Sequence, residues 1–160
     1  MAKQKTGAQV GRFGLIGVLN TVIDYVVFIG LTKLFSIPLD RVWTAKLVSG
    51  ALAMANSFYF NKTWVFKSGN KHAGQQFARF MVSTLVGVFI IQLGLVQFFS
   101  SVFPDIGQLF YLIAASLGVT ALLPAVITQA FVIKTVAFGL ATIASMSWNF
   151  LLYKFWAFKS

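Results

Sequence analysis

Cysteine is absent from the 160-residue chain, which also has only three acidic residues and one histidine. Without cysteine there is no disulfide framework, no thiolate metal site and no cysteine nucleophile. Three carboxylates and one imidazole leave too few groups for a metal cage or a paired-carboxylate active site. The sequence has no Gly-rich phosphate loop, no H-E-x-x-H and no G-x-S-x-G motif. We therefore expect no enzymatic activity, no catalytic residue, no metal site and no cofactor.

Apolar residues are abundant instead. They make up 58% of the chain, charged residues make up 10%, and the mean hydropathy is +0.82. A soluble domain of this size cannot bury so much apolar surface, so the composition predicts an all-α integral membrane protein. The net charge of +10 is then best explained by lysines and arginines that lie in cytoplasmic segments and face anionic lipid, and not by a nucleic-acid partner.

Four apolar stretches are long enough to be membrane spans, since a span needs about 20 mainly apolar residues. They cover residues 13–35, 42–64, 77–102 and 130–153. The uncharged stretch 106–133 is harder to assign. We expect a short interfacial or re-entrant helix over 108–123, before the last span, whereas the alternative is a fifth span.

The phrase K-x-W-x-F-K-S occurs twice, at residues 62–68 and again at 154–160. Upstream, GRFGLIG at 11–17 resembles ARFMVST at 78–84. The pattern predicts one membrane domain, residues 1–160, made of two parallel two-helix repeats over about 11–68 and 77–160. The phrase itself suits a membrane interface, where aromatic rings sit at headgroup level and lysines reach water or phosphate. We expect such anchors at Trp64, Phe66, Trp156 and Phe158.

Basic residues indicate the orientation. If the chain has four membrane spans, nine basic residues lie on the same side of the membrane, which should be the cytoplasmic side. The predicted protein is therefore a multi-pass protein of the cell membrane with both termini inside. The nine residues are Lys3, Lys5, Arg12, Lys62, Lys67, Lys71, Arg79, Lys154 and Lys159.

Polar residues inside the predicted spans are candidates for function, because they are costly in lipid. Asn20 and Asp24 lie four apart, on one face of the first span, and Lys46 in the second span is the best partner for Asp24. A stripe of Lys46, Gly50, Ala53 and Ser57 follows helical spacing, with Asn56 one residue off it. Lys134 and Asn149 hold similar places in the last span. The simple interpretation is an ion pair that holds the helices together; the functional one is a polar cavity between them.

The chain resembles the GtrA-like family of small membrane proteins. The resemblance lies in RFGLIGVLNTVIDYVVF, in NSFYFNKTWVF and in the closing WNFLLYKFWAF. It implies that the protein flips a polyprenyl-phosphate-linked sugar across the membrane for cell-surface polysaccharide synthesis. The alternative is a membrane scaffold that recruits a glycosyltransferase without moving lipid.

Site residues follow from combining this resemblance with the residues themselves. Asn20 and Asp24 are expected to serve the sugar or a gate. Lys46, Lys62, Lys134 and Lys154 are expected to contact the phosphate or headgroup, and Asn56 and Asn149 complete the expected substrate-binding residues. The expected partners are the lipid-linked sugar, membrane lipid and a glycosyltransferase. Because four helices form a thin wall around a sugar, we also expect a homo-oligomer.

Overall fold

The computed structural model describes residues 6–69 and 72–159, and it is all-helical over those residues. The first helix, α1, spans Thr6–Leu34. After Pro38 and the short 3₁₀ turn η1 (Leu39–Arg41), α2 spans Val42–Phe60 and continues as the π-helical turn η2 (Asn61–Val65). Lys3, Lys5 and Lys71, which the orientation argument used, lie outside the described residues.

The second half of the chain contains two further long helices. One begins as α3 (Ala73–Leu85) and continues through η3 (Val86–Gln92), α4 (Leu93–Gln97) and η4 (Phe98–Val102). The other is α7 (Gln129–Leu152), which ends in the π-helical turn η5 (Tyr153–Ala157). The predicted all-α fold is confirmed, and each of the four apolar stretches forms a long helix.

Three of the described stretches are long and apolar enough to cross a membrane, namely Thr6–Leu34, Ala73–Val102 and Gln129–Ala157. The helix formed by α2 and η2 is not among them, although α2 alone has 19 residues. Its polar side chains, such as Lys46, Asn56 and Lys62, reduce its hydropathy. The protein is therefore a multi-pass membrane protein, and the four-span repeat arrangement remains a prediction.

The stretch between the third and fourth long helices forms two short helices, α5 (Asp105–Ser116) and α6 (Val119–Leu122), separated by Gly118 at φ 73°. At 1.5 Å per residue, the 12 residues of α5 span about 18 Å, less than the hydrocarbon core of a bilayer. One short helix over 108–123 was predicted, and the structure has helix in this region but divides it in two at Gly118. Neither α5 nor α6 is long enough to form the alternative fifth span. The interfacial or re-entrant position of α5 remains a prediction.

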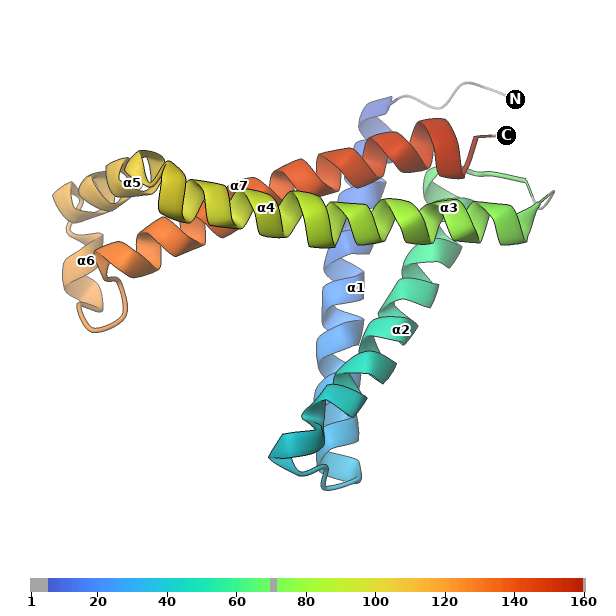
Figure 1. The fold of residues 1–160 in the computed structure, drawn as a ribbon, viewed down its shortest axis with the longest axis horizontal. Helices are drawn as coiled ribbons and strands as arrows, with labels where there is room; N and C mark the ends of the chain where they lie inside the picture. The colour runs from blue at the N-terminus through green and yellow to red at the C-terminus, as the bar shows by residue number, and fades with distance from the viewer. Residues whose placement is uncertain (1–5, 70–71, 160) are drawn as a thin grey trace. The chain divides into compact units, whose positions relative to one another are not determined.

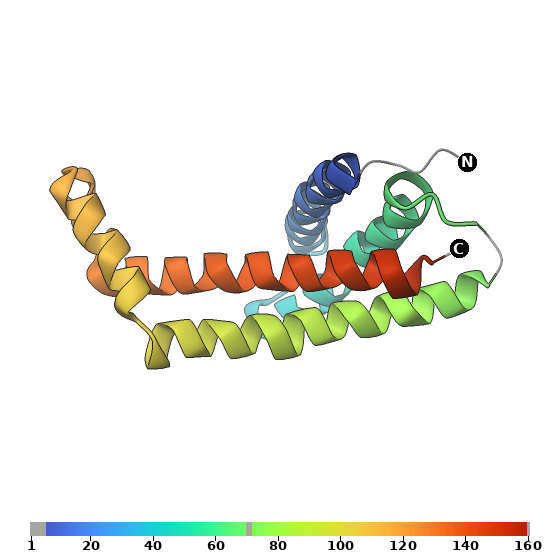
Figure 2. The same ribbon diagram turned by 90° about the horizontal axis from the view of Figure 1, so that it is seen from above.

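The chain forms two compact units, which we describe separately. The first contains the described residues up to Phe80 and from Tyr153 onward; within it α1 packs along α2 (Figure 1). The second unit is Met81–Leu152, in which α7 runs beside η3 and α4 and also contacts α5 (Figures 1 and 2). Contact with α5 is close, since a Cβ on Gly107 would lie 2.7 Å from the Cα of Ile133.

Small residues line the buried faces of α2 and α7. The buried residues are Ala45, Ser49 and Ala53 on α2, and Ala137, Ala141 and Ser145 on α7. Of the stripe predicted on α2, only Ala53 is buried, whereas Lys46, Gly50 and Ser57 lie beside the packed face. A Cβ on Gly50 would meet nothing within 4 Å, because the adjacent residue, Ser49, occupies the face turned toward α1.

An aromatic core closes the first unit where the two K-x-W-x-F-K-S phrases end. Phe80, Tyr153 and Phe158 are buried, and the rings of Phe80 and Tyr153 are 4.8 Å apart between centroids. Phe66 of the first phrase stacks on Phe158 of the second, with centroids 5.5 Å apart and planes at 19°. Burial of large aromatic rings makes this cluster a main source of stability in the unit.

Candidate functional site

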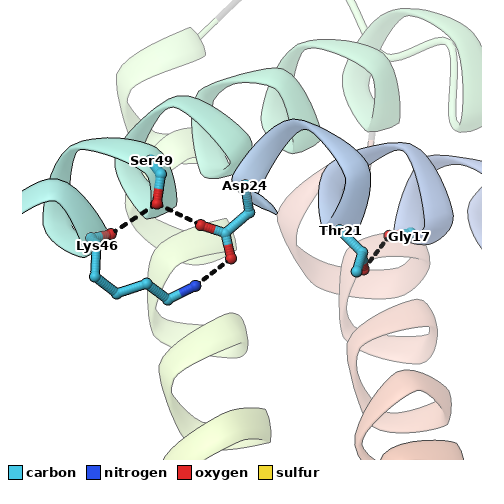
Figure 3. Close-up of polar contacts among 5 residues, drawn as sticks. All are labelled: Gly17, Thr21, Asp24, Lys46 and Ser49. Atoms are coloured by element: carbon cyan, nitrogen blue, oxygen red, sulfur yellow. Dashed lines mark hydrogen bonds and ion pairs between the residues drawn. The ribbon is translucent and has the colours of Figure 1, made fainter. Parts of the chain in front are cut away.

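A charged cluster lies between α1 and α2. The carboxylate of Asp24 forms an ion pair with the ammonium group of Lys46, and Ser49 donates a hydrogen bond to its other oxygen at 2.6 Å (Figure 3). The side chain of Asp24 is 26% exposed and that of Lys46 is 60% exposed. The predicted pairing of Asp24 with Lys46 is confirmed, since the lysine reaches along α2 to the carboxylate.

A second polar contact follows one helical turn away on α1. Asn56 donates a hydrogen bond from Nδ2 to Oδ1 of Asn20 at 2.7 Å. The two pairs thus form a ladder of polar contacts along the α1–α2 packing face. The neighbouring hydroxyl of Thr21 is not part of it, because it donates to the carbonyl of Gly17 on its own helix at 3.0 Å (Figure 3).

The two lysines of the repeated phrase occupy different environments. Lys62 is buried, and its ammonium lies 5.8 Å from the centroid of the Phe58 ring. Lys154 is only partly buried; it donates a hydrogen bond to Thr6 Oγ1 at 2.9 Å and lies over the Phe155 ring. Equivalent positions in the sequence therefore differ in solvation and in partners.

Both tryptophans of the phrase contact an arginine. The guanidinium of Arg12 lies 5.3 Å from the ring centroid of Trp64 and donates to the Trp64 carbonyl at 3.3 Å. Arg79 does the same to Trp156, at 5.7 Å and 3.1 Å. Each arginine thus combines a cation–π contact with a hydrogen bond to a carbonyl near a helix C-terminus.

The predicted anchors differ in exposure. Trp64 and Trp156 are 38% and 39% exposed, whereas Phe158 is 3% exposed and packs in the aromatic core with Phe66. The place of these rings relative to a membrane interface remains a prediction.

The remaining predicted site residues, Lys134 and Asn149, belong to the second unit. Lys134 is exposed near the start of α7. Asn149 lies against Gly87, where an added Cβ would be 2.7 Å from its Oδ1 atom. The polar ladder of the first unit is complete without either residue. Two further contacts join the helices of the second unit, from Ser145 to the Gly87 carbonyl at 2.8 Å and from Gln92 to Thr142 at 3.3 Å.

Sequence reasoning missed Ser49 and three buried amide side chains. Gln9, Asn61 and Gln76 are each less than 9% exposed, and each has a side-chain oxygen without a hydrogen-bond partner among the described residues. A signal was available for two of them, since Q-x-x-R-F occurs at residues 9–13 and again at 76–80. For Asn61 and Ser49 the hydropathy pattern gives no such indication.

Comparison with known proteins identifies the family. The chain is 35% identical over 72 residues to the uncharacterized membrane protein YngA of Bacillus subtilis (strain 168). That match covers 45% of this chain and 46% of the relative, so the similarity spans about half the length of each. No solved structure matches the chain. Residues 12–158 match the family described as "GtrA/DPMS, transmembrane domain", which covers nearly the whole chain, and the protein therefore belongs to this family.

Proposed function

We propose that this protein flips a polyprenyl-phosphate-linked sugar from the cytoplasmic to the outer leaflet of the cell membrane, where the sugar is used for polysaccharide glycosylation. Family membership supports the handling of polyprenyl-phosphate sugars. The observation that carries the transport step is the polar ladder, in which Asp24, Lys46 and Ser49 are followed by Asn20 and Asn56.

The ladder offers the chemistry that a sugar needs inside a membrane. A charge near the bilayer centre costs about 2.5–3.5 kcal/mol on insertion scales, so a buried carboxylate needs a partner or a function. Here the carboxylate has a partner, but the pair is not sealed, because the side chain of Lys46 is 60% exposed. Sugar hydroxyls can replace Ser49 and Lys46 as donors to Asp24, and amides such as Asn20 and Asn56 both donate and accept.

Lysines supply the charge for the phosphate. In the proposed orientation, with both termini inside, Lys62 and Lys154 lie at the cytoplasmic end of the first unit. Lys134 lies near the start of α7 in the second unit and would meet the headgroup on the outer side. The proposed protein is a translocator that does not use ATP itself.

The alternative is a membrane scaffold that holds a glycosyltransferase and moves no lipid. The Asp24–Lys46 ion pair supports this alternative, because such a pair stabilises a helical hairpin without any ligand. In that case the polar ladder serves only to hold α1 and α2 together.

The decisive experiment uses the full chain in liposomes with a fluorescent polyprenyl-phosphate sugar. Protein-containing vesicles should expose the inner-leaflet label to an external quencher, whereas empty vesicles should not. The oligomeric state is measured on the same sample, and we expect a homo-oligomer. No flipping by a well-folded protein that still binds a glycosyltransferase would favour the scaffold.

A further inference from the structure

Asp24 is the acidic residue that the chain places inside a helix long enough to cross a membrane. The sequence has three acidic residues. Asp40 lies in the turn η1 and Asp105 is the first residue of α5, and both are exposed. Asp24 instead lies within α1, which is long and apolar enough to be a span. A carboxylate inside a membrane is costly unless its charge is neutralised, so the groups around Asp24 decide which charge it can carry.

One ammonium group neutralises this carboxylate, and it belongs to Lys46. Helix α1 packs against α2 and η2, which carry two basic residues, Lys46 and Lys62. At 1.5 Å per residue, Lys62 lies about 24 Å further along the helix than Lys46. On α1 itself, Arg12 and Lys33 are about 18 Å and about 14 Å from Asp24 along the helix axis. The charge of Asp24 is therefore balanced by Lys46 alone among the described residues of these elements.

The ion pair can be reached by another anion. The side chain of Lys46 is 60% exposed, compared with 26% for that of Asp24. Lysine has a flexible stem, and its ammonium is a compact charge that balances a single anion. When a phosphodiester anion takes this ammonium, Asp24 keeps the hydrogen bond from Ser49 but loses its counter-charge. A desolvated carboxylate without a counter-charge is unstable, and it is neutralised by taking up a proton.

We propose that the Asp24–Lys46 pair takes up one proton with each phosphodiester anion that it binds, with the anion on Lys46 and the proton on Asp24. The proton comes from water, and Lys46 stays protonated throughout. The neutral carboxyl group can still accept the hydrogen bond from Ser49, and its new O–H can donate to an oxygen of the ligand. The proton returns to water when the anion leaves and the ion pair forms again. As a lipid-linked sugar, the anion rests on the proposed function.

Charge balance gives this linkage a consequence for transport. Without ligand, the charges of Asp24 and Lys46 cancel each other. In the complex the carboxyl group is neutral, and the ammonium cancels the single negative charge of the phosphodiester. The site is neutral in both states, so lipid and proton cross the membrane together without net charge. A flippase without this linkage would move one negative charge with each lipid.

Proton uptake is measured on the purified full chain in detergent, with a short-chain prenyl phosphate carrying a hexose as the probe. A pH-indicator dye in weakly buffered solution reports the protons, and a phosphodiester itself does not titrate near neutral pH. We expect uptake of about one proton per bound ligand, and an affinity about tenfold higher at about pH 6 than at about pH 7. Binding without proton uptake, at an affinity that pH does not change, would overturn the proposal and leave the proposed function standing.

Variants assign the proton to a residue. Asp24→Asn carries a permanently neutral amide, so it should bind the probe without proton uptake and equally well at both pH values. The matched controls are Asp40→Asn, which removes an exposed carboxylate, and His72→Gln, because histidine ordinarily changes its charge in this range. Both controls should take up the proton like the unaltered protein. Loss of uptake in His72→Gln, with uptake retained in Asp24→Asn, would refute the proposal.

The liposome assay separates the proton linkage from transport itself. A difference of about one pH unit across the vesicle should redistribute the fluorescent lipid about tenfold toward the alkaline side, and a membrane potential at equal pH should leave it evenly distributed. An uncoupled anionic lipid would ignore the pH difference and gather on the positive side, which would overturn the proposal while supporting the flipping of lipid. Proton-linked binding by a protein that flips no lipid would refute the proposed function and leave the linkage standing.

Discussion

The two units use the same packing but different polar chemistry. When the chain is aligned on Trp64 and Trp156, the buried small residues of α2 correspond one by one to those of α7, namely Ala45, Ser49 and Ala53 to Ala137, Ala141 and Ser145. When it is aligned on Arg12 and Arg79, Asn20 corresponds to Gly87 and Asp24 to Ile91. The second unit therefore keeps the close helix packing and loses the ion pair.

What the second unit has in place of the ladder is a set of uncharged contacts. Asn149 occupies the space beside Gly87, and Gln92 reaches Thr142 one residue further along than the position of Asp24. The difference teaches that small-residue packing in this fold does not require a polar ladder. The ladder of the first unit is thus a feature beyond what helix packing needs, which is why we place function there.

The largest expected effect is loss of transport on removing the charge from the ladder. Asp24→Asn leaves the ammonium of Lys46 without its counter-ion, and we expect the flipping rate to fall at least about 100-fold, equivalent to about 2.7 kcal/mol. Asn20→Ala should act in the same direction. The measurement is the quenching assay in liposomes, with expression and oligomer size recorded for each variant.

Asp40→Asn is the matched control, because Asp40 is exposed and its contact with Arg41 is long, at 3.9 Å. It should flip lipid at the normal rate. Normal transport by Asp24→Asn would contradict the site, as would a failure of this variant to accumulate as folded protein, since the residue would then be a structural member of an ion pair.

The second expected effect concerns α5, a short helix of the second unit that packs on α7. Gly107→Ala places a methyl group 2.7 Å from the Cα of Ile133. Because Ile133 Cα is part of the α7 backbone, relieving this clash requires a shift of α5 or α7. We expect a loss of about 1–3 kcal/mol of stability, seen as a lower midpoint of thermal unfolding in detergent. Gly94→Ala is the control, because nothing lies within 4 Å of the added Cβ. Equal midpoints for the two variants would show that α5 does not pack on α7 as described.

A third prediction sharpens the comparison between the two copies of the phrase. Lys62→Ala should weaken binding of the prenyl phosphate about tenfold, and Lys154→Ala only about threefold, because Lys154 already has a hydrogen bond to Thr6 and is more exposed. The dissociation constant of each purified variant is measured by titration with a short-chain prenyl phosphate. Equal and slight losses would leave both lysines as interface anchors.

The smallest expected effect is one that the two copies should share. Arg12→Gln and Arg79→Gln each remove a cation–π contact and a hydrogen bond to a tryptophan carbonyl. We expect each to lower the stability by about 1 kcal/mol. Arg41→Gln is a suitable control, because its side chain is 73% exposed. A large difference between the first two variants would break the equivalence of the copies.

Much of the fold follows from the sequence, because hydropathy reports directly on which stretches avoid water. It located all four long helices and the short helix before the last one, and the cost of a lone charge in lipid led from Asp24 to Lys46. Hydropathy does not report which face of an apolar helix meets its neighbour. The packed stripe was therefore placed one residue away from Ser49, and the serine that binds Asp24 was missed.

Side chains near the helix ends were harder to predict for a related reason. Trp64 and Phe66 lie two residues apart in one phrase and were given one role. In the structure Phe66 stacks on Phe158 in the aromatic core, whereas the Trp64 ring contacts the guanidinium of Arg12. Because the core forms from three separate parts of the chain, around Phe66, Phe80 and Tyr153, no local pattern in the phrase predicts which rings pack together.

The stack of Phe66 on Phe158 has a consequence for how the two halves of the sequence can change. Each ring contacts its own counterpart in the other copy of the phrase, so a substitution in one copy alters the surroundings of the same position in the other. A change at either ring therefore calls for a compensating change at its twin. The aligned residues Asn20 and Gly87 have separate neighbours, Asn56 for the one and Asn149 for the other, and each can diverge independently. Mutual contact thus gives a physical reason for the phenylalanine that the two phrases share, while the interior of the helices has a different chemistry in each half.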